Sequence, residues 1–224
     1  MKILWEDKSL LVIEKPAGVL SEPSESGEDV VSLLTKETGK PVFLVHRLDR
    51  NTGGVMALAK RQDVAGALSG AIQNREFIKE YFAVIHGKPE EPEGVFEDLL
   101  FKDSSKNKTF VVKRERKGVK KASLSYRVLD TAETGGETVS LVLVRLHTGR
   151  THQVRVQFAS RKRPLLGDGK YGSRDNRCET ALWSARLAFS HPKTGKPVSA
   201  ESVPPREYPW DLFPAERFVT GTLE

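Results

Sequence analysis

Strand-like segments that follow one another with few helices between them constrain the fold of this chain most. Each segment is short, and several carry β-branched and aromatic residues at alternate positions, which is the period of a β-strand. The segments are Ile3–Trp5, Leu10–Glu14, Val42–His46, Val55–Ala59, Phe77–His86, Ala122–Leu129, Thr138–His147 and Leu182–Phe189. Parallel strands need long crossover connections, and most of these segments lack them. The pattern therefore predicts an α+β domain with a mixed, mostly antiparallel sheet.

Helical spacing of apolar residues is confined to three segments, which we expect to flank the sheet. They cover residues 27–39, 61–76 and 151–161, and Asp63 is the expected N-cap of the second. No linker between the expected elements is long or polar enough to mark a domain boundary. We therefore expect one domain over residues 1–224.

Positive charge is concentrated in two segments. The chain as a whole carries +6 and has a pI of about 9.4. Residues 101–121 hold nine Lys or Arg against two acids, so the rest of the chain is close to neutral. Residues 149–163 add five Arg or Lys and no acid. A solvated surface would explain one such run, but two runs on a balanced chain favour a phosphate backbone as the partner.

A single carboxylate, Asp49, lies between Arg47 and Arg50 in the stretch HRLDRNTGG. If this stretch is a strand, Arg47 and Asp49 project to the same side, and the guanidinium favours the ionised carboxylate. An ionised Asp can act as a nucleophile or base, but it can equally form a structural ion pair that fixes the following turn. Spacing alone favours the ion pair and leaves both readings open.

Tyr81, in the stretch KEYFAVIHG, has the same two readings. A lone Tyr in a strand is usually part of the core. The functional alternative is a surface on which an unstacked base can lie.

Other site classes find little support in the sequence. The five histidines form no HExxH pattern, and the chain has neither the GxxxxGK[ST] spacing of a phosphate loop nor a GxGxxG after a strand. One cysteine, Cys178, excludes an intramolecular disulfide and a multi-cysteine metal site. We therefore expect no metal, no cofactor and a reducing cytoplasmic location. No apolar run is long enough to span a bilayer, and no secretory signal opens the chain.

Four stretches, in this order and spacing, resemble the RluA family of RNA pseudouridine synthases. They are HRLDRNTGG, KEYFAVIHG, LHTGRTHQVRVQFA and PLLGDGKYG, and the opening LLVIEKPAGVL resembles the lead-in strand and turn of the same family. The resemblance covers residues 3–204. It implies the pseudouridine synthase fold, with helices and loops around a central RNA-binding cleft, and isomerisation of uridine to pseudouridine in RNA without a cofactor.

The resemblance also implies roles for individual residues. Asp49 matches the catalytic aspartate, Tyr81 the tyrosine that stacks on the target base, and Arg155 the arginine that pairs with the aspartate. Other positions are expected to shape the site or hold RNA: His46, Arg47, Arg50, Thr52, Arg150 and His152 from the motifs, and Lys113, Arg114, Arg116 and Lys117 from the basic segment.

The chain departs from the family pattern at three places. Gly53 stands where the family usually has Ser, Gln157 replaces a common His, and Trp183 lies in LWS where the family usually has LHA. The S4-type RNA-binding domain of many relatives is not expected here, so residues 101–121 are the first candidate for substrate choice.

The expected partner is ribosomal or transfer RNA, and the expected state is a monomer. Two rival functions stay open, namely a non-catalytic RNA-binding or ribosome-assembly protein on this fold, and a hydrolase that uses Asp49 as its base.

Overall fold

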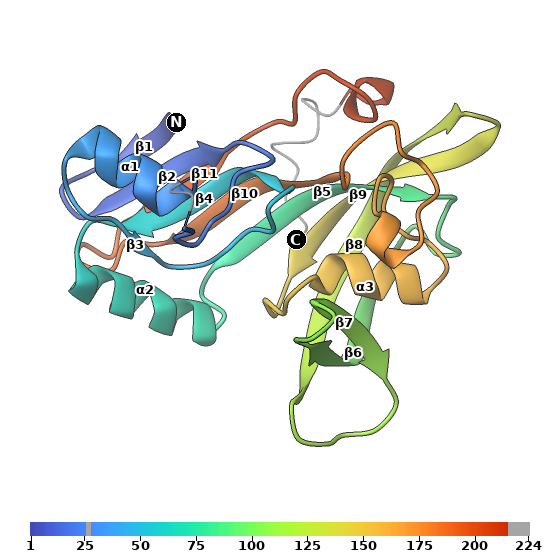
Figure 1. Ribbon diagram of the computed structural model, residues 1–224, viewed down its shortest axis with the longest axis horizontal. Coiled ribbons are helices and arrows are strands. Elements are labelled where there is room, and N and C mark those ends of the chain that lie inside the picture. Colours follow the sequence, from blue (N-terminus) through green and yellow to red (C-terminus); the bar gives the residue numbers. More distant parts are fainter. Residues whose placement is uncertain (26–27, 215–224) are drawn as a thin grey trace. The chain divides into compact units, whose positions relative to one another are not determined.

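The computed structural model describes residues 1–25 and 28–214 of the chain (Figure 1). Packing divides the described residues into two units. The first comprises Met1–Lys79 and Trp183–Pro204, and the second comprises Glu80–Leu182 and the part that begins at Pro205. Each unit is built around strands with few helices, so the α+β class predicted from the strand pattern is confirmed.

The sheet of the first unit is built from strands that run in the order β1, β2, β4 and β10. Their bounds are β1 Lys2–Glu6, β2 Leu10–Lys15, β4 Gly53–Ala59 and β10 Leu182–Ser190. Two shorter strands join them, β3 (Phe43–Leu44) against β4 and β11 (Pro197–Glu201) against β10. The β4–β10 pair is parallel and the other pairs of this unit are antiparallel, so the sheet is mixed as predicted.

Helices α1 (Val30–Thr38) and α2 (Gln62–Gln73) belong to this unit (Figure 1). Asp29 caps α1 by accepting from the Ser32 amide, and Gly39 ends it in a left-handed conformation. The prediction that Asp63 caps α2 is wrong. The N-cap is Arg61, and Asp63 instead lies in the first turn, where its carboxylate pairs with the Arg61 side chain.

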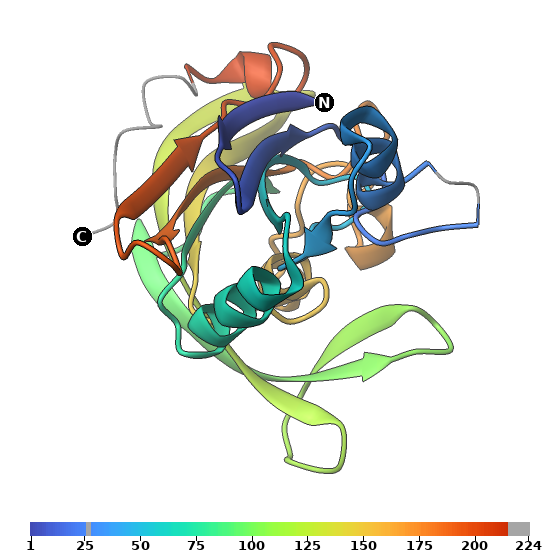
Figure 2. The same ribbon diagram turned by 90° about the vertical axis from the view of Figure 1, so that its left-hand side faces the viewer.

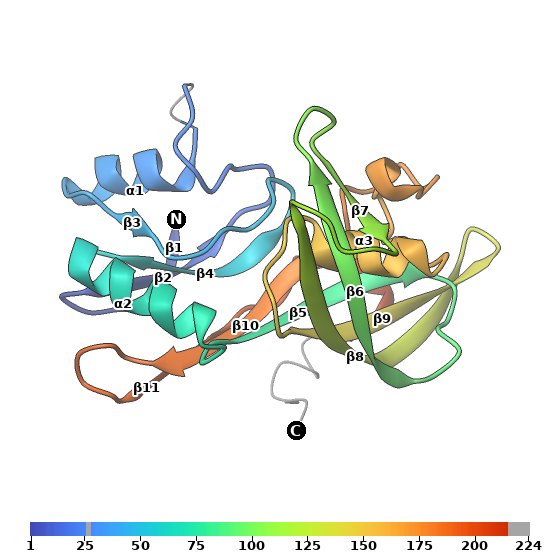
Figure 3. The ribbon, with the colours of Figure 1, turned by 90° about the horizontal axis from the view of Figure 1, so that it is seen from below.

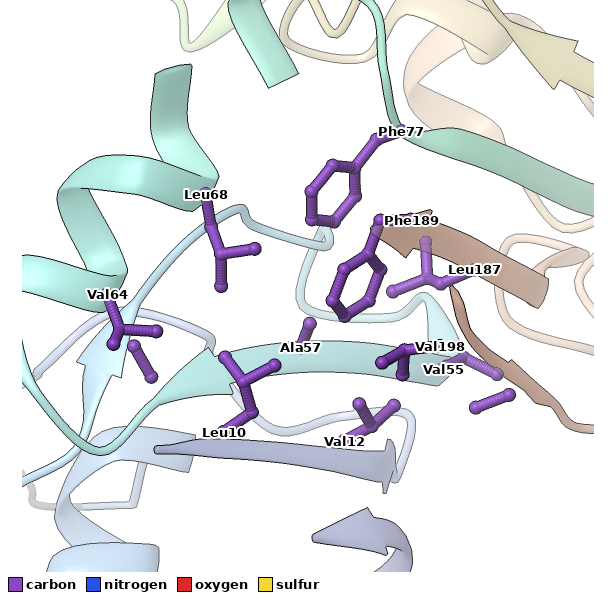
Figure 4. Packing of buried hydrophobic residues seen from close by; sticks show 12 residues of the cluster. Leu10, Val12, Val55, Ala57, Val64, Leu68, Phe77, Leu187, Phe189 and Val198 are labelled. Carbon is purple, nitrogen blue, oxygen red and sulfur yellow. The ribbon is translucent and has the colours of Figure 1, made fainter. Parts of the chain in front are cut away.

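Figure 4 shows the core of the first unit, where α2 packs on β2, β4 and β10. Val64 and Leu68 of α2 are buried in the same apolar cluster as Leu10 of β2 and Val55 of β4. Phe77 and Phe189 stack with ring centroids 4.4 Å apart. Burying an apolar side chain of this size stabilises a fold by about 1.5–3 kcal/mol. This core supports β4, which begins directly after the stretch that carries Asp49.

The second unit contains an antiparallel sheet in the order β5, β9, β8, β6 and β7. The bounds are β5 Ile78–His86, β6 Glu93–Asp103, β7 Lys108–Val112, β8 Val119–Thr134 and β9 Glu137–Leu146. Helix α3 (Gln153–Ser160) packs beside β6 and β7 (Figure 3), and short 3-10 turns lie at Gly169–Tyr171 and Trp210–Leu212. In the described residues, no helix is long and apolar enough to cross a membrane.

The basic segment predicted at residues 101–121 is an ordered part of this sheet. It contains the end of β6, all of β7 and the start of β8, which are drawn in green in Figure 2. Neither β6 nor β7 was expected, because charged residues interrupt the alternation of β6 and β7 has only five residues. The exposed turn Lys113–Gly118, which we call the basic turn, joins β7 to β8.

Candidate active site

Asp49 lies in a loop and not, as the strand reading assumed, in an extension of the strand before it. That strand, β3, ends at Leu44, and the chain reaches β4 only at Gly53. The loop is fastened on both sides of the carboxylate. The Leu48 amide donates to Ser21 Oγ at 3.1 Å and the Ser21 hydroxyl donates back to the Leu48 carbonyl at 2.8 Å. The Thr52 amide donates to the Asp49 carbonyl at 3.0 Å. The backbone that presents Asp49 is therefore held in one conformation.

Lys15, at the end of β2, also binds the loop that carries Asp49. Its side chain is fully buried, and its ammonium donates to the carbonyls of Pro16, Val19 and Arg50 at 2.8, 2.7 and 3.0 Å. Burial lowers the pKa of Lys15 to about 8, and the negative charge of Asp49 opposes this shift. Three carbonyl acceptors suit a charged ammonium with three donors. Lys15 thus places a buried positive charge in the electrostatic field of Asp49.

The motif residues around Asp49 have separate partners in the first unit. His46 Nε2 accepts from the Ala57 amide at 3.1 Å, and burial together with the charge on Lys79 lowers the pKa of His46 to about 3. Arg47 pairs with Glu22 at 2.7 Å on the exposed surface. His46 is therefore a neutral residue that ties the loop to β4. Arg47 forms an ion pair with Glu22, and the alternative of a structural ion pair between Arg47 and Asp49 stays a prediction.

Arg50 and Thr52 complete this group. The Arg50 side chain is exposed and its Nε donates to the Gly18 carbonyl at 2.9 Å, while the Gly18 amide donates to the Arg50 carbonyl at 2.9 Å. Thr52 is buried. Their backbone contacts shape the loop, and the RNA-binding roles expected for their side chains stay predictions.

Gly53 and Trp183, two of the departures from the family pattern, lie against each other. They are register partners of the parallel β4–β10 pair, and a Cβ added to Gly53 would come within 2.3 Å of a Trp183 ring carbon. Trp183 is buried, and its indole N–H donates to the Ser202 carbonyl at 3.2 Å. The large ring occupies the space that a serine side chain at position 53 would need, so the two departures compensate each other.

Tyr81 lies in β5 of the second unit, where it is 5% exposed and opposite Val144 of β9. The preceding residue, Glu80, is buried and accepts from two guanidinium nitrogens of Arg145 at 2.8 and 3.1 Å. This ion pair fixes the strand beside Tyr81. The expected stacking of Tyr81 on the target base stays a prediction.

Arg155, on α3, is fixed by a carboxylate of its own unit. Its Nε and Nη2 donate to the two carboxylate oxygens of Asp168 at 2.7 and 2.8 Å, and both side chains are buried. The guanidinium also lies 5.2 Å from the centre of the Tyr171 ring. This two-point pairing sets the orientation of the guanidinium plane. The expected pair of Arg155 with Asp49 joins the two units and stays a prediction.

The loop before α3 is held by Gln153. The Thr148 hydroxyl and the Arg150 amide donate to Gln153 Oε1 at 2.7 and 3.0 Å, and Gln153 Nε2 donates to the Ser123 carbonyl. His152, the N-cap of α3, has a left-handed backbone with φ of 52°. Arg150 is exposed and its Nε donates to the Lys121 carbonyl at 3.0 Å. The GRTHQ stretch is thus a structured loop that attaches α3 to β8.

The four basic residues assigned to RNA all lie in the exposed basic turn; they are Lys113, Arg114, Arg116 and Lys117. The Arg116 guanidinium covers the Phe101 ring at 4.5 Å. In the third departure from the family pattern, Gln157 is buried and its Nε2 donates to Asp98 at 2.7 Å, so it packs α3 on β6. Among the described residues, no group of three or more potential metal ligands forms a cluster.

Sequence reasoning missed three residues of this region, Lys15, Asp168 and Tyr171. Each lies in a stretch that carried the family resemblance, EKPAG or GDGKYG. In the sequence, Lys15 is visible only as a polar residue at the end of a strand, and Asp168 and Tyr171 only as polar residues among glycines. Neither pattern shows that the side chain is buried. Their roles follow only from the three-dimensional contacts.

Comparison with known proteins identifies the family. Residues 9–160 match the RNA pseudouridylate synthase family. The chain is 30% identical over 204 residues to an uncharacterized RNA pseudouridine synthase of Mycoplasma genitalium, an overlap that covers 88% of this chain and 65% of that one. It is 31% identical to ribosomal large subunit pseudouridine synthase D of Zymomonas mobilis, over 92% of this chain and 70% of that one. The chain thus spans about two thirds of the length of these relatives.

Among solved structures, human RNA pseudouridylate synthase domain containing 4 matches with a TM-score of 0.75 and 25% identity, over 92% of this chain and 89% of that one. The fold and the family implied by the four motif stretches are therefore confirmed. The chain belongs to the RNA pseudouridylate synthase family.

Proposed function

We propose that this protein isomerises uridine to pseudouridine within RNA, with Asp49 as the catalytic residue. The observation that carries the proposal is the family match over residues 9–160, a range that contains Asp49, Tyr81 and Arg155. The fastened loop around Asp49 supports it, because a catalytic carboxylate must be held in a productive geometry. So does the buried charge of Lys15 in the field of Asp49.

The proposed reaction rearranges bonds within one nucleotide. The N1–C1′ glycosidic bond breaks, the uracil turns, and C5 forms the new bond to C1′. The proton on C5 leaves and N1 gains one, so the product has the atoms of the substrate. Asp49 either attacks C1′ directly or removes the C2′ proton to give a glycal. Both routes need the ionised carboxylate and a site that excludes water, which would otherwise trap the intermediate.

Tyr81 and Arg155 have supporting roles in this proposal. Tyr81 stacks on the uracil and accepts the C5 proton, and Arg155 provides the positive charge that faces Asp49. The target uridine must leave its base stack, which costs a few kcal/mol. Contacts between RNA phosphates and the exposed basic turn offset part of this cost. Arg47, Arg50, Arg150 and His152 are the further candidates for RNA contacts.

The proposed substrate is ribosomal or transfer RNA, and we expect the protein to act as a cytoplasmic monomer. Large-subunit ribosomal RNA has the stronger support, because three of the similar proteins are named ribosomal large subunit pseudouridine synthases. The exposed basic turn, which connects β7 to β8, supports a polyanionic partner.

The test is to incubate the protein with RNA from cells that lack the gene and to map pseudouridine. Pseudouridine at defined sites, without RNA cleavage or released uracil, is the expected result. RNA binding without any modified nucleotide would favour the non-catalytic RNA-binding function. Released uracil or cleaved RNA would favour a hydrolase.

A further inference from the structure

The hydroxyl of Tyr171 contacts two parts of the second unit: strand β7, which leads to the basic turn expected to bind RNA, and the N-cap of α3, the helix that carries Arg155. Tyr171 is buried at the end of the 3-10 turn that begins beside Asp168. Its Oη accepts from the Thr109 amide of β7 at 2.9 Å and lies 2.9 Å from His152 Nδ1. One contact leads to β7, the strand that runs into the basic turn, and the other leads to the N-cap of the helix that carries Arg155.

The Tyr171 hydroxyl can serve both contacts at once. The Thr109 amide can only donate, so Tyr171 Oη accepts from it. Burial raises the pKa of Tyr171, so the phenol keeps its proton. The contact with His152 Nδ1 joins the same oxygen to the N-cap of α3, with the donor set by the tautomer of His152.

The Tyr171 ring makes the third connection. The Arg155 guanidinium lies 5.2 Å and the Lys108 ammonium of β7 5.1 Å from the ring centre, both within cation–π range. Asp168, which holds Arg155 at two points, is the N-cap of the same 3-10 turn, and the Tyr171 amide donates to its carbonyl at 3.0 Å. Tyr171 and Asp168 thus form one rigid support beneath Arg155.

Two further contacts attach the hairpin formed by β6 and β7 to the segments around α3 and Tyr171. The Thr109 hydroxyl donates to the Thr151 carbonyl at 2.9 Å, and the Lys170 ammonium donates to the Asn107 carbonyl at 3.1 Å. Thr109 is 2% exposed, so its amide has no access to water as an alternative partner. A displacement of β7 is therefore transmitted to the Tyr171 ring.

We propose that Tyr171 is a positioning residue that couples β7 and the basic turn to the orientation of Arg155. RNA held by the basic turn fixes β7, β7 fixes the Tyr171 hydroxyl, and the Tyr171 ring with Asp168 sets the guanidinium. Through this coupling, RNA at the basic turn adjusts the orientation of the Arg155 guanidinium that Asp168 already holds. This inference rests on the proposed function, because it assigns to Arg155 a part in the reaction.

Tyr171→Phe tests the proposal, since it keeps the ring beside Arg155 and removes only the hydroxyl. The matched control is Tyr126→Phe, which removes a hydroxyl of the same unit that donates to the Glu91 carbonyl at 3.2 Å. Single-turnover rates are measured at saturating enzyme on in vitro transcribed large-subunit ribosomal RNA, with RNA affinity measured separately. Thermal unfolding of each variant confirms that the assays compare folded proteins.

The expected result is a single-turnover rate about tenfold lower for Tyr171→Phe, RNA affinity within about twofold of wild type, and a wild-type rate for Tyr126→Phe. Neutralising Lys113 and Arg114 slows the wild-type protein but adds no further loss to Tyr171→Phe. A wild-type rate for Tyr171→Phe would overturn the proposal. The proposal would also be overturned if the rate losses from Tyr171→Phe and from neutralising Lys113 and Arg114 multiplied when the changes were combined.

A readout without turnover separates this inference from the proposed function. The Arg155 Nε–H group, which donates to Asp168, gives an NMR signal that reports on guanidinium order. Addition of the same RNA is expected to change this signal in the wild type and in Tyr126→Phe but not in Tyr171→Phe. An equal change in Tyr171→Phe overturns the coupling, whereas absence of pseudouridine from the wild-type reaction overturns only the proposed function.

Discussion

Trp183 of β10 lies over Gly53 of β4, so close that no side chain can be added to Gly53 without moving the indole. The two residues are far apart in the sequence, and each departs from the pattern expected for the family. Their contact lies where β4 begins, directly after the loop that presents Asp49. The local packing of this strand end is therefore specific to the chain.

Gly53→Ser is expected to destabilise the protein by about 1–3 kcal/mol, because it overpacks the contact with Trp183. In a Trp183→His background the smaller ring leaves room, and the same substitution should cost less. Free energies of unfolding from urea titration measure this coupling. The control is Gly54→Ala, since a Cβ there would meet the Ser184 backbone at 2.2 Å and the change at position 183 cannot relieve it. Additive effects of Gly53→Ser and Trp183→His would contradict the explanation.

Lys15→Met is expected to slow pseudouridine formation in protein that is still folded. The substitution removes the Lys15 donor from the Pro16 and Val19 carbonyls and leaves the Arg50 carbonyl beside Asp49 with only the Gly18 amide. A buried polar group that loses its partner costs about 1–3 kcal/mol. The single-turnover rate is measured at a temperature where thermal unfolding shows the variant to be native. Lys60→Met is the control, because that lysine donates to the Asp7 carbonyl instead. A wild-type rate for folded Lys15→Met would remove Lys15 from the site.

His46 makes the stability of the protein sensitive to acid. Its pKa is about 3 in the folded protein, below the ordinary 6.5 of histidine, so between these values the unfolded chain binds a proton that the native protein does not. Stability should therefore fall as the pH falls from 6.5 toward 3, by up to about 1.4 kcal/mol per pH unit from this group. The measurement is urea unfolding of wild type and His46→Gln at pH 7 and pH 5. Parallel losses in the two proteins would show that His46 does not titrate in this way.

Neutralising the basic turn should weaken RNA binding and reduce its salt dependence. Replacement of Lys113, Arg114, Arg116 and Lys117 by Ser removes charges that are expected to contact phosphates. Each lost phosphate contact lowers the slope of log affinity against log salt by about 0.7–0.9. The control replaces an equal number of exposed lysines in the first unit: Lys2, Lys8, Lys36 and Lys40. An equal loss of RNA affinity in the two variants would mean that the basic turn acts only through the net charge of the protein.

The sequence predicted the elements whose apolar period is strong. The strands at β2 and β4 were found close to their observed bounds because they are continuous runs of buried apolar residues, and the helix at α2 because Val64 and Leu68 repeat at helical spacing. Strand β6 was missed because acids and a lysine interrupt its apolar residues, and β7 because it has only five residues. A pattern of buried residues is visible in a sequence only where exposed and buried positions differ in polarity.

The candidate site was predictable where a motif carries it and not where tertiary contacts create it. Asp49, Tyr81 and Arg155 follow from the family resemblance. The pairing of Arg155 with Asp168, the burial of Lys15 and the contact of Gly53 with Trp183 join residues that no local period relates. The expectation that Arg47 and Asp49 share one face of a strand failed because β3 ends at Leu44 and hydrogen bonds at Leu48 and Thr52 hold the motif as a loop.

The most direct test of the central claim is pseudouridine formation by Asp49→Asn, which keeps the shape of the side chain and removes its charge. Wild-type protein should convert defined uridines in RNA from cells that lack the gene. Folded Asp49→Asn should bind the same RNA and form no pseudouridine, because neither route of the reaction can proceed without the ionised carboxylate. Turnover by Asp49→Asn at a rate near that of the wild type would contradict the account.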